Sequence, residues 1–241
     1  MRKGIAMDKT IEEIAKKYIV NNDYDFVNTI YAFNIFKNYL KGKTVLEIGS
    51  ADGVMTEKIV NIAKRVDVVE PSKFYYDIIK NIKGVNLIFN DFIENISFKD
   101  TYKVVLTASL LHYIERPDIF LFELKKVLNN NSIVLATVPN MTSLHRQMGV
   151  EMGLLKSVYD ETERNRKFQQ FGRFDLNSFK KLFEDCGYEI LESYGYMLKP
   201  FSSDIMFRLN LSKKQLNALF YLGKKYQEIC SQLFVRAKIK L

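Results

Sequence analysis

Two histidines and two glutamates are the side chains best suited to chemistry in this sequence. His112 and His145 are the only histidines, and an imidazole titrates near neutral pH, so either ring could accept a proton from a reacting group. Glu47 and Glu70 each lie in or directly after a short apolar run, and a carboxylate at Glu70 can accept both hydroxyls of a ribose. These residue types indicate a nucleotide-type ligand beside a group that can take up a proton.

The loop after Glu47 has glycines four residues apart. Gly49 and Gly53 let the backbone turn sharply and approach a ligand that a Cβ would repel. The helix expected after them presents free N–H groups to a carboxylate or a phosphate. Because Ser50 and Ala51 fill the interior, the spacing is G-x-x-x-G and differs from the G-x-G-x-x-G of dinucleotide-binding loops. The alternative is an ordinary strand-to-helix turn in which the glycines serve only packing.

Strands and helices alternate along the chain, as a parallel sheet with right-handed crossovers requires. Short apolar runs predict strands near residues 44–48, 66–72, 85–92, 102–108, 132–140, 188–193 and 232–239. Helical periodicity predicts helices over 9–19, 25–40, 54–64, 73–82, 119–128, 175–187 and within 202–229. Ser72 is expected as an N-cap, and either Asp175 or Asn177 should begin the helix that ends at Gly187. Residues 141–170 are charged, helical in pattern and long for a loop, which indicates a lid over the substrate.

Composition and charge limit the classes of protein that fit. The chain of 241 residues has a net charge of +8, which favours anionic partners, although the scattered lysines are typical of a solvated surface. Cys186 and Cys230 lie far apart and match no disulfide framework or zinc site, and no His/Asp/Glu cluster indicates a catalytic metal. No segment has the pattern of a signal peptide or approaches the ~20 apolar residues of a membrane span. We therefore expect a cytoplasmic protein.

Several segments resemble the class I S-adenosylmethionine-dependent methyltransferases. Residues 47–53 are similar to motif I of that family, (D/E)-x-G-x-x-x-G, and the L-x-H at 110–112 and the V-P-N at 138–140 are similar to later segments. Lys103 and the asparagines at 129–131 depart from the family pattern. The resemblance implies S-adenosylmethionine as the cofactor and an α/β, Rossmann-like fold. Its seven-stranded sheet should be mostly parallel, with the seventh strand antiparallel between strands five and six.

The same resemblance implies one methyltransferase domain over residues 1–241. We expect a helical preface over 1–40 and a cofactor-binding core over 41–140. A lid over 141–173 and the C-terminal half of the sheet, with a helical insertion, over 174–241 should complete the domain.

The family pattern also assigns roles around the cofactor. It places the acid of motif I near the methionine end, the acid after strand two on the ribose, and the acid after strand three on the adenine amino group. The residues expected to bind the cofactor are Glu47, Gly49, Ser50, Ala51, Gly53, Glu70, Pro71, Ser72, Asp91, Phe92, Ala108 and Ser109.

The acceptor side carries a second resemblance. The string V-P-N-x-x-S-L-H-R at 138–146 is similar to bacterial methyltransferases associated with sugars, surface polysaccharides and capsule. It implies O-methylation of a small polar or anionic acceptor, such as a nucleotide-linked sugar or another surface-glycan precursor. We expect His145 to be the general base and Arg146 to hold a phosphate or carboxylate.

Other residues leave alternatives open on the acceptor side. His112 is the second candidate for the base, although the histidine at this place in the family often belongs to the scaffold. Tyr18 and Tyr24 could close the cleft over the substrate, but aromatic residues at helical spacing are also typical of a core. The relatives often have Gly-His where this chain has Gln169 and Gln170, so a base used there would be missing here.

Three other functions remain to be distinguished. A nucleic-acid methyltransferase would suit the isoelectric point of about 9.2, but Thr107-Ala108-Ser109-Leu110 stands where base-methylating enzymes carry N-P-P-(Y/F). An NAD-dependent oxidoreductase fits Glu70 but not the glycine spacing. A non-catalytic, cofactor-binding partner of another enzyme is the third. We expect a small-molecule substrate and no nucleic acid, and the sequence leaves the oligomeric state open.

Overall fold

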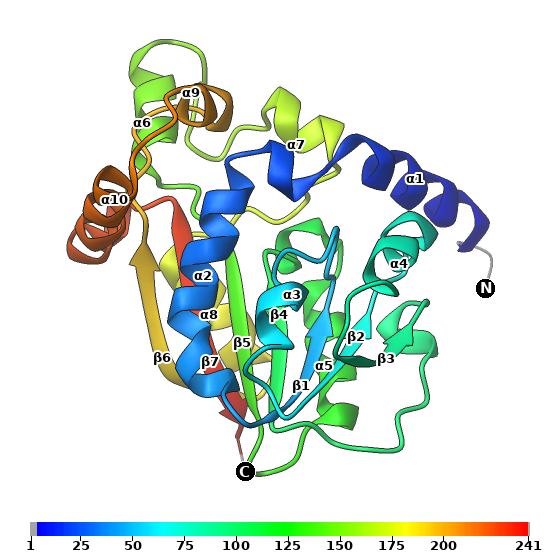
Figure 1. Cartoon of the computed structure of the whole chain (residues 1–241). Coiled ribbons are helices and arrows are strands. Elements are labelled where there is room, and N and C mark those ends of the chain that lie inside the picture. The colour runs from blue at the N-terminus through cyan, green and yellow to red at the C-terminus, as the bar shows by residue number, and fades with distance from the viewer. Residues whose placement is uncertain (1–3, 241) are drawn as a thin grey trace.

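The computed structural model describes the backbone of residues 4–240 and the side chains of residues 11–240, so residues 1–3 and 241 of the predicted domain lie outside it. Seven strands in the described part form one sheet, in the order β3-β2-β1-β4-β5-β7-β6 (Figure 1). The strands are β1 (Thr44–Ile48), β2 (Arg65–Val69), β3 (Val85–Phe89), β4 (Val104–Ala108), β5 (Ile133–Pro139), β6 (Tyr188–Tyr196) and β7 (Gln232–Ile239). Only β7 runs antiparallel to its neighbours, β5 and β6. The predicted fold class and the predicted place of the antiparallel seventh strand, between strands five and six, are confirmed.

The helices follow the strands as crossovers or lie in the segments that flank them. Their bounds are α1 (Gly4–Lys17), α2 (Asp25–Leu40), α3 (Thr56–Ile59), α4 (Lys73–Ile79), α5 (Pro117–Leu124), α6 (Leu144–Glu151), α7 (Glu163–Lys167), α8 (Leu176–Asp185), α9 (Ser203–Arg208) and α10 (Lys213–Lys225). Short 3₁₀ turns include η1 (Val20–Asn22) and η3 (Leu111–Tyr113). Ser72 caps α4 as predicted, because its side chain accepts the N–H of Tyr75. Of the two candidates for the start of α8, Asp175 is the cap, and its side chain accepts the N–H of Ser178.

Helices cover both faces of the sheet, since parallel strands are apolar on each side. On one face, Phe120 of α5 and Phe183 of α8 pack with Leu46 of β1 in one apolar cluster. On the other face, Phe36 of α2 and Ile79 of α4 pack into a second cluster with strand residues. The two clusters fix the positions of the strand ends, where the loops that carry the candidate site begin.

Two predicted helical segments are shorter than the sequence indicates. The helix predicted over 54–64 is a single turn, α3, because competing hydrogen bonds interrupt it. The Asn61 amide donates to the carbonyl of Glu57 at 2.6 Å, and the carbonyl of Ile62 accepts the N–H of Gly42 at 2.8 Å. The predicted lid over 141–173 is helical only in α6 and α7.

None of the helices in the described part is both long enough and apolar enough to cross a membrane.

Candidate active site

A cavity of about 1410 Å³ opens at the carboxyl edge of the parallel strands. The ends of β1, β2, β4 and β5 line one side of it, and the segment from α1 to α2 and the loops around α6 and α7 line the other. Figure 1 shows these segments above the tips of the strands. Because ligands of open α/β sheets bind beyond the carboxyl ends of the strands, this cavity is the candidate active site.

The glycine loop after β1 forms the floor of the cavity. Gly49 and Gly53 have φ values of 75° and 83°, which favour glycine. A Cβ on Gly49 would lie 2.8 Å from Cδ1 of Leu110, so the Leu110 side chain would have to move to admit it. Ala51 and Ser109 also have positive φ, 48° and 51°. Such strained backbone gathers at ligand sites, and both residues line the cavity.

Glu47 lies in β1, directly before the glycine loop. Its carboxylate accepts the hydroxyl hydrogen of Thr56 at 2.6 Å, and the residue is only 2% exposed. Burial raises the pKa of Glu47 to about 7. Thr56 was not expected as a partner, although a threonine at the start of the following helix is within reach of a carboxylate at the strand end.

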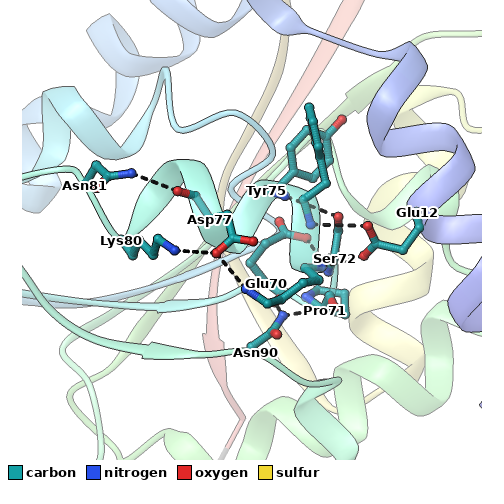
Figure 2. A network of polar contacts seen from close by, with 11 residues as sticks. Glu12, Glu70, Pro71, Ser72, Tyr75, Asp77, Lys80, Asn81 and Asn90 are labelled. Carbon is teal, nitrogen blue, oxygen red and sulfur yellow. Dashed lines mark hydrogen bonds and ion pairs between the residues drawn. The ribbon is translucent and has the colours of Figure 1, made fainter.

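Glu70 follows β2 and joins the glycine loop to α4. Its Oε2 accepts the N–H of Ala51 at 3.1 Å and the hydroxyl of Ser50 at 3.4 Å, while Oε1 accepts the N–H of Ser72 at 3.0 Å. Figure 2 shows Glu70 next to Ser72 at the start of α4. Burial raises the pKa of Glu70 to about 7. A carboxylate offers roughly four acceptor positions, so a diol can take the free one and displace the long Ser50 contact.

The N-terminal segment is fastened over this part of the cavity. Glu12 of α1 accepts the backbone N–H groups of Lys73 at 2.5 Å and Phe74 at 3.2 Å, the first turn of α4 (Figure 2). A carboxylate at a helix N-terminus satisfies free N–H groups and interacts favourably with the helix dipole. The hydroxyl of Tyr75 donates to the carbonyl of Tyr18 at 2.7 Å. These contacts place the end of α1 beside Glu70.

The residues expected around the cofactor divide into three groups. Those that line the cavity are Glu47, Gly49, Ser50, Ala51, Glu70, Pro71, Phe92, Ala108 and Ser109. Gly53 and Ser72 lie behind the lining, where they shape the turn and cap α4. Asp91 is exposed outside the lining, and its Oδ1 accepts the N–H of Phe92 and the amide of Asn95, both at 2.7 Å. Its contact with adenine stays a prediction.

Both histidines line the cavity and are uncharged at neutral pH. His145 lies in the first turn of α6, whose N-cap is Ser143, so it is not a helix cap. Burial, and then the charges of Lys199 and Arg146, lower the pKa of His145 to about 2. Burial also lowers the pKa of His112 in η3 to about 3. In the described part of the chain neither Nδ1 atom has a hydrogen-bond partner, so no other protein group engages either nitrogen.

The other residues predicted on the acceptor side lie in different surroundings. Tyr18 lines the cavity, and its hydroxyl donates to Oδ2 of Asp25 at 2.6 Å. Tyr24 is 1% exposed and lies outside the cavity lining, in the core beneath it. Arg146 lines the cavity, but its Nε and Nη2 donate to the carbonyls of Val158 and Asp160 in the loop after α6. Two of its donors therefore hold the lid, and its binding of substrate stays a prediction.

Sequence reasoning missed a group of charged side chains on the wall opposite the glycine loop. Arg164 of α7 donates to Asp23 and Asp25, each at 2.8 Å, which ties the lid to the start of α2 and the residues just before it. Lys199, three residues after β6, is only 7% exposed and lines the cavity. A polar residue just beyond the carboxyl end of a strand was a usable signal for Lys199. Gln170, at the expected departure from the relatives, donates to the hydroxyl of Tyr113 at 3.1 Å.

Known proteins share both sequence and fold with this chain. The family model described as a methyltransferase domain matches residues 23–193. The mitochondrial ubiquinone biosynthesis O-methyltransferase of Schizosaccharomyces pombe is 28% identical over 156 residues, which are 60% of this chain and 56% of that protein. The chain thus spans little more than half the length of that relative.

Solved structures show the same fold at low sequence identity. The possible histamine N-methyltransferase of Thermotoga maritima has a TM-score of 0.64 and 15% identity over 96% of this chain and 99% of that one. The N-methyltransferase NodS of Bradyrhizobium japonicum, solved with S-adenosyl-L-homocysteine, has a TM-score of 0.55 and 14% identity over 90% of this chain and 87% of that one. Because the family model covers more than half of the chain and the sheet has the family's strand order, this protein belongs to the class I S-adenosylmethionine-dependent methyltransferases.

Proposed function

We propose that this methyltransferase methylates an oxygen atom of a small polar acceptor, with His145 as the group that takes the acceptor's proton. The observation that carries the proposal is the uncharged His145 ring on the cavity wall, with a buried Nδ1 that has no partner in the described part of the chain. A hydroxyl group must lose its proton when it is methylated, and a free imidazole nitrogen can accept it.

The chain's own residues fit the cofactor at the opposite end of the cavity. When bound, S-adenosylmethionine supplies an electrophilic methyl group on a good leaving group. Glu70 would accept the ribose hydroxyls, Phe92 would contact the adenine, and Glu47 and the loop from Gly49 would lie near the methionine end. The strained backbone of this loop and the open acceptor position on Glu70 support the assignment.

The enclosed shape of the site favours a small acceptor. The segments around α1, α6 and α7 cover the strand ends, and the exclusion of water and the positioning of the nucleophile are the main tasks in methyl transfer. A relative that is named an O-methyltransferase supports oxygen as the methylated atom. Within this class we place nucleotide-linked sugars and other glycan precursors first, on the strength of the 138–146 string.

The partition of labelled methyl groups tests this proposal. After incubation with S-adenosylmethionine carrying a tritiated methyl group, we expect label in small nucleotide-linked sugars and much less in transfer RNA or DNA. The label should be stable to mild base, as an ether is, whereas a methyl ester is not. Incorporation into polynucleotides alone would contradict the proposal. Tight binding of a mixed RNA pool that weakens steeply as the salt concentration rises would also contradict the proposal.

A further inference from the structure

We propose that the acceptor carries an anionic group, a carboxylate or a phosphate, and that Lys199 is the residue that binds it in the cavity. The inference rests on the proposed function, because it names the chemistry of the molecule that is methylated. It adds a binding residue outside the cofactor loop and outside the residues predicted from the sequence.

Lys199 is a buried ammonium group with few partners. It lies after β6, is 7% exposed, and lines the cavity. Its Nζ donates to the hydroxyl of Ser203 at 3.1 Å and lies 5.9 Å from the ring centroid of Tyr24. None of the ion pairs among residues 11–240 includes it. An ammonium has three donors, so Lys199 has capacity for an anionic oxygen.

The nearby carboxylates are already engaged elsewhere. Asp25 accepts the Tyr18 hydroxyl and Arg164 through Oδ2, and the Asn28 amide through Oδ1 at 3.0 Å. Asp23 accepts the other side of the Arg164 guanidinium. These acids stabilise Lys199 only at a distance, and burial together with Arg164 lowers its pKa to about 8. Buried charges are normally paired, so a ligand that brings a negative charge completes this site.

His145 gives the second, independent observation. Its Nδ1 is buried in the same cavity and has no partner in the described part of the chain. After burial, the charge of Lys199 is the main cause that depresses the pKa of His145. An anion paired with Lys199 would cancel that charge and raise the pKa of His145, which makes the imidazole a stronger base. Burial, the larger cause of the low pKa, would remain, so the anion would remove only the part that comes from Lys199.

The presence of only two histidines makes the test direct. Protein saturated with S-adenosylhomocysteine is titrated with inorganic phosphate and, separately, with benzoate at pH 7, while NMR follows the His145 ring signals, assigned with H145Q. We expect at least one anion to shift these signals in a saturable way, because the bound charge changes the surroundings of the ring. In Lys199→Met the anion should bind at least about tenfold more weakly. The matched control, Lys225→Met, changes an exposed lysine on α10 and should respond like the unaltered protein.

The identity of the responding anion distinguishes the two sources. A response to phosphate alone points to a phosphate-bearing acceptor, and a response to benzoate alone points to a carboxylate. Lys199→Arg keeps the positive charge and should retain the shift of the His145 signals. This variant still tests the inference if the Lys199→Met protein folds poorly. If neither anion moves the His145 signals, or if Lys199→Met responds as strongly as the control, the inference is wrong. If the unaltered protein does not bind S-adenosylhomocysteine at all, that result would instead count against the proposed function.

Discussion

Replacing His145 by alanine should lower the rate of a single methyl transfer by about 10²–10⁴-fold while the affinity for S-adenosylhomocysteine stays unchanged. The expectation follows from the place of this ring. It lines the cavity, it is uncharged, and it does not cap α6. The loss of a helix cap would cost only about 1 kcal/mol of stability and little chemistry. The rate should therefore fall far more than the melting temperature.

Two variants make the His145 result interpretable. Glu151→Ala alters an exposed residue of the same helix and should leave the rate unchanged. His112→Ala removes the second uncharged ring of the cavity, and a smaller loss of rate there would assign the proton to His145. A stable His145→Ala protein with full single-turnover activity would exclude it as the base. The choice would then lie between His112 and positioning without any base.

Replacing Glu70 by alanine should weaken cofactor binding by at least about tenfold. A hydrogen bond to a charged acceptor contributes roughly 1.5–3 kcal/mol, and about 1.4 kcal/mol corresponds to a factor of ten in affinity. The same change frees the N–H groups of Ala51 and Ser72, which the carboxylate now holds. Glu57→Ala, an exposed glutamate on α3, should bind as the unaltered protein does. Equal affinities for both variants would show that Glu70 does not hold the ribose.

The raised pKa of Glu70 adds a dependence on pH with a definite sign. Ribose hydroxyls donate to a carboxylate, so they bind the ionised form, which prevails above pH 7 because the folded-state pKa is about 7. Binding of S-adenosylhomocysteine should therefore weaken about tenfold between pH 8 and pH 6, since the ionised fraction falls by that factor. Glu47 has a similar pKa, so Glu70→Gln should reduce the slope without abolishing it. If the affinity of Glu70→Gln for S-adenosylhomocysteine depends on pH as strongly as that of the unaltered protein, the pH dependence comes from another group.

The sheet, the turn of the glycine loop and the helix caps were predictable because they depend on local patterns. Apolar runs, the glycine spacing and cap residues such as Ser72 and Asp175 each act over a few residues, and the strand order followed from the family resemblance. The length of α3 was not predictable, because hydrogen bonds from Gly42 and Asn61 interrupt a helical pattern that the sequence alone favours.

The acceptor side was less predictable because its contacts join distant parts of the chain. Arg164 and Asp25 lie 139 residues apart in sequence, and nothing local to either residue indicates the pair. Helical periodicity indicates that Tyr24 is buried, but it does not tell whether the side chain lies in the core or in the wall of a cleft. The structure places Tyr24 in the core. Lys199 was overlooked because its place just after a strand end is a weak signal in a chain with many lysines, and only the structure shows that it is buried.

Calorimetry with S-adenosylhomocysteine and NAD on the unaltered protein tests the central assignment most directly. The G-x-x-x-G loop and the ribose-binding role proposed for Glu70 suit a single nucleoside, whereas the loop lacks the second glycine that admits a pyrophosphate. We expect saturable binding of S-adenosylhomocysteine with one site per chain and no measurable heat from NAD. Tight binding of NAD, with no response to S-adenosylhomocysteine or S-adenosylmethionine, would contradict the account.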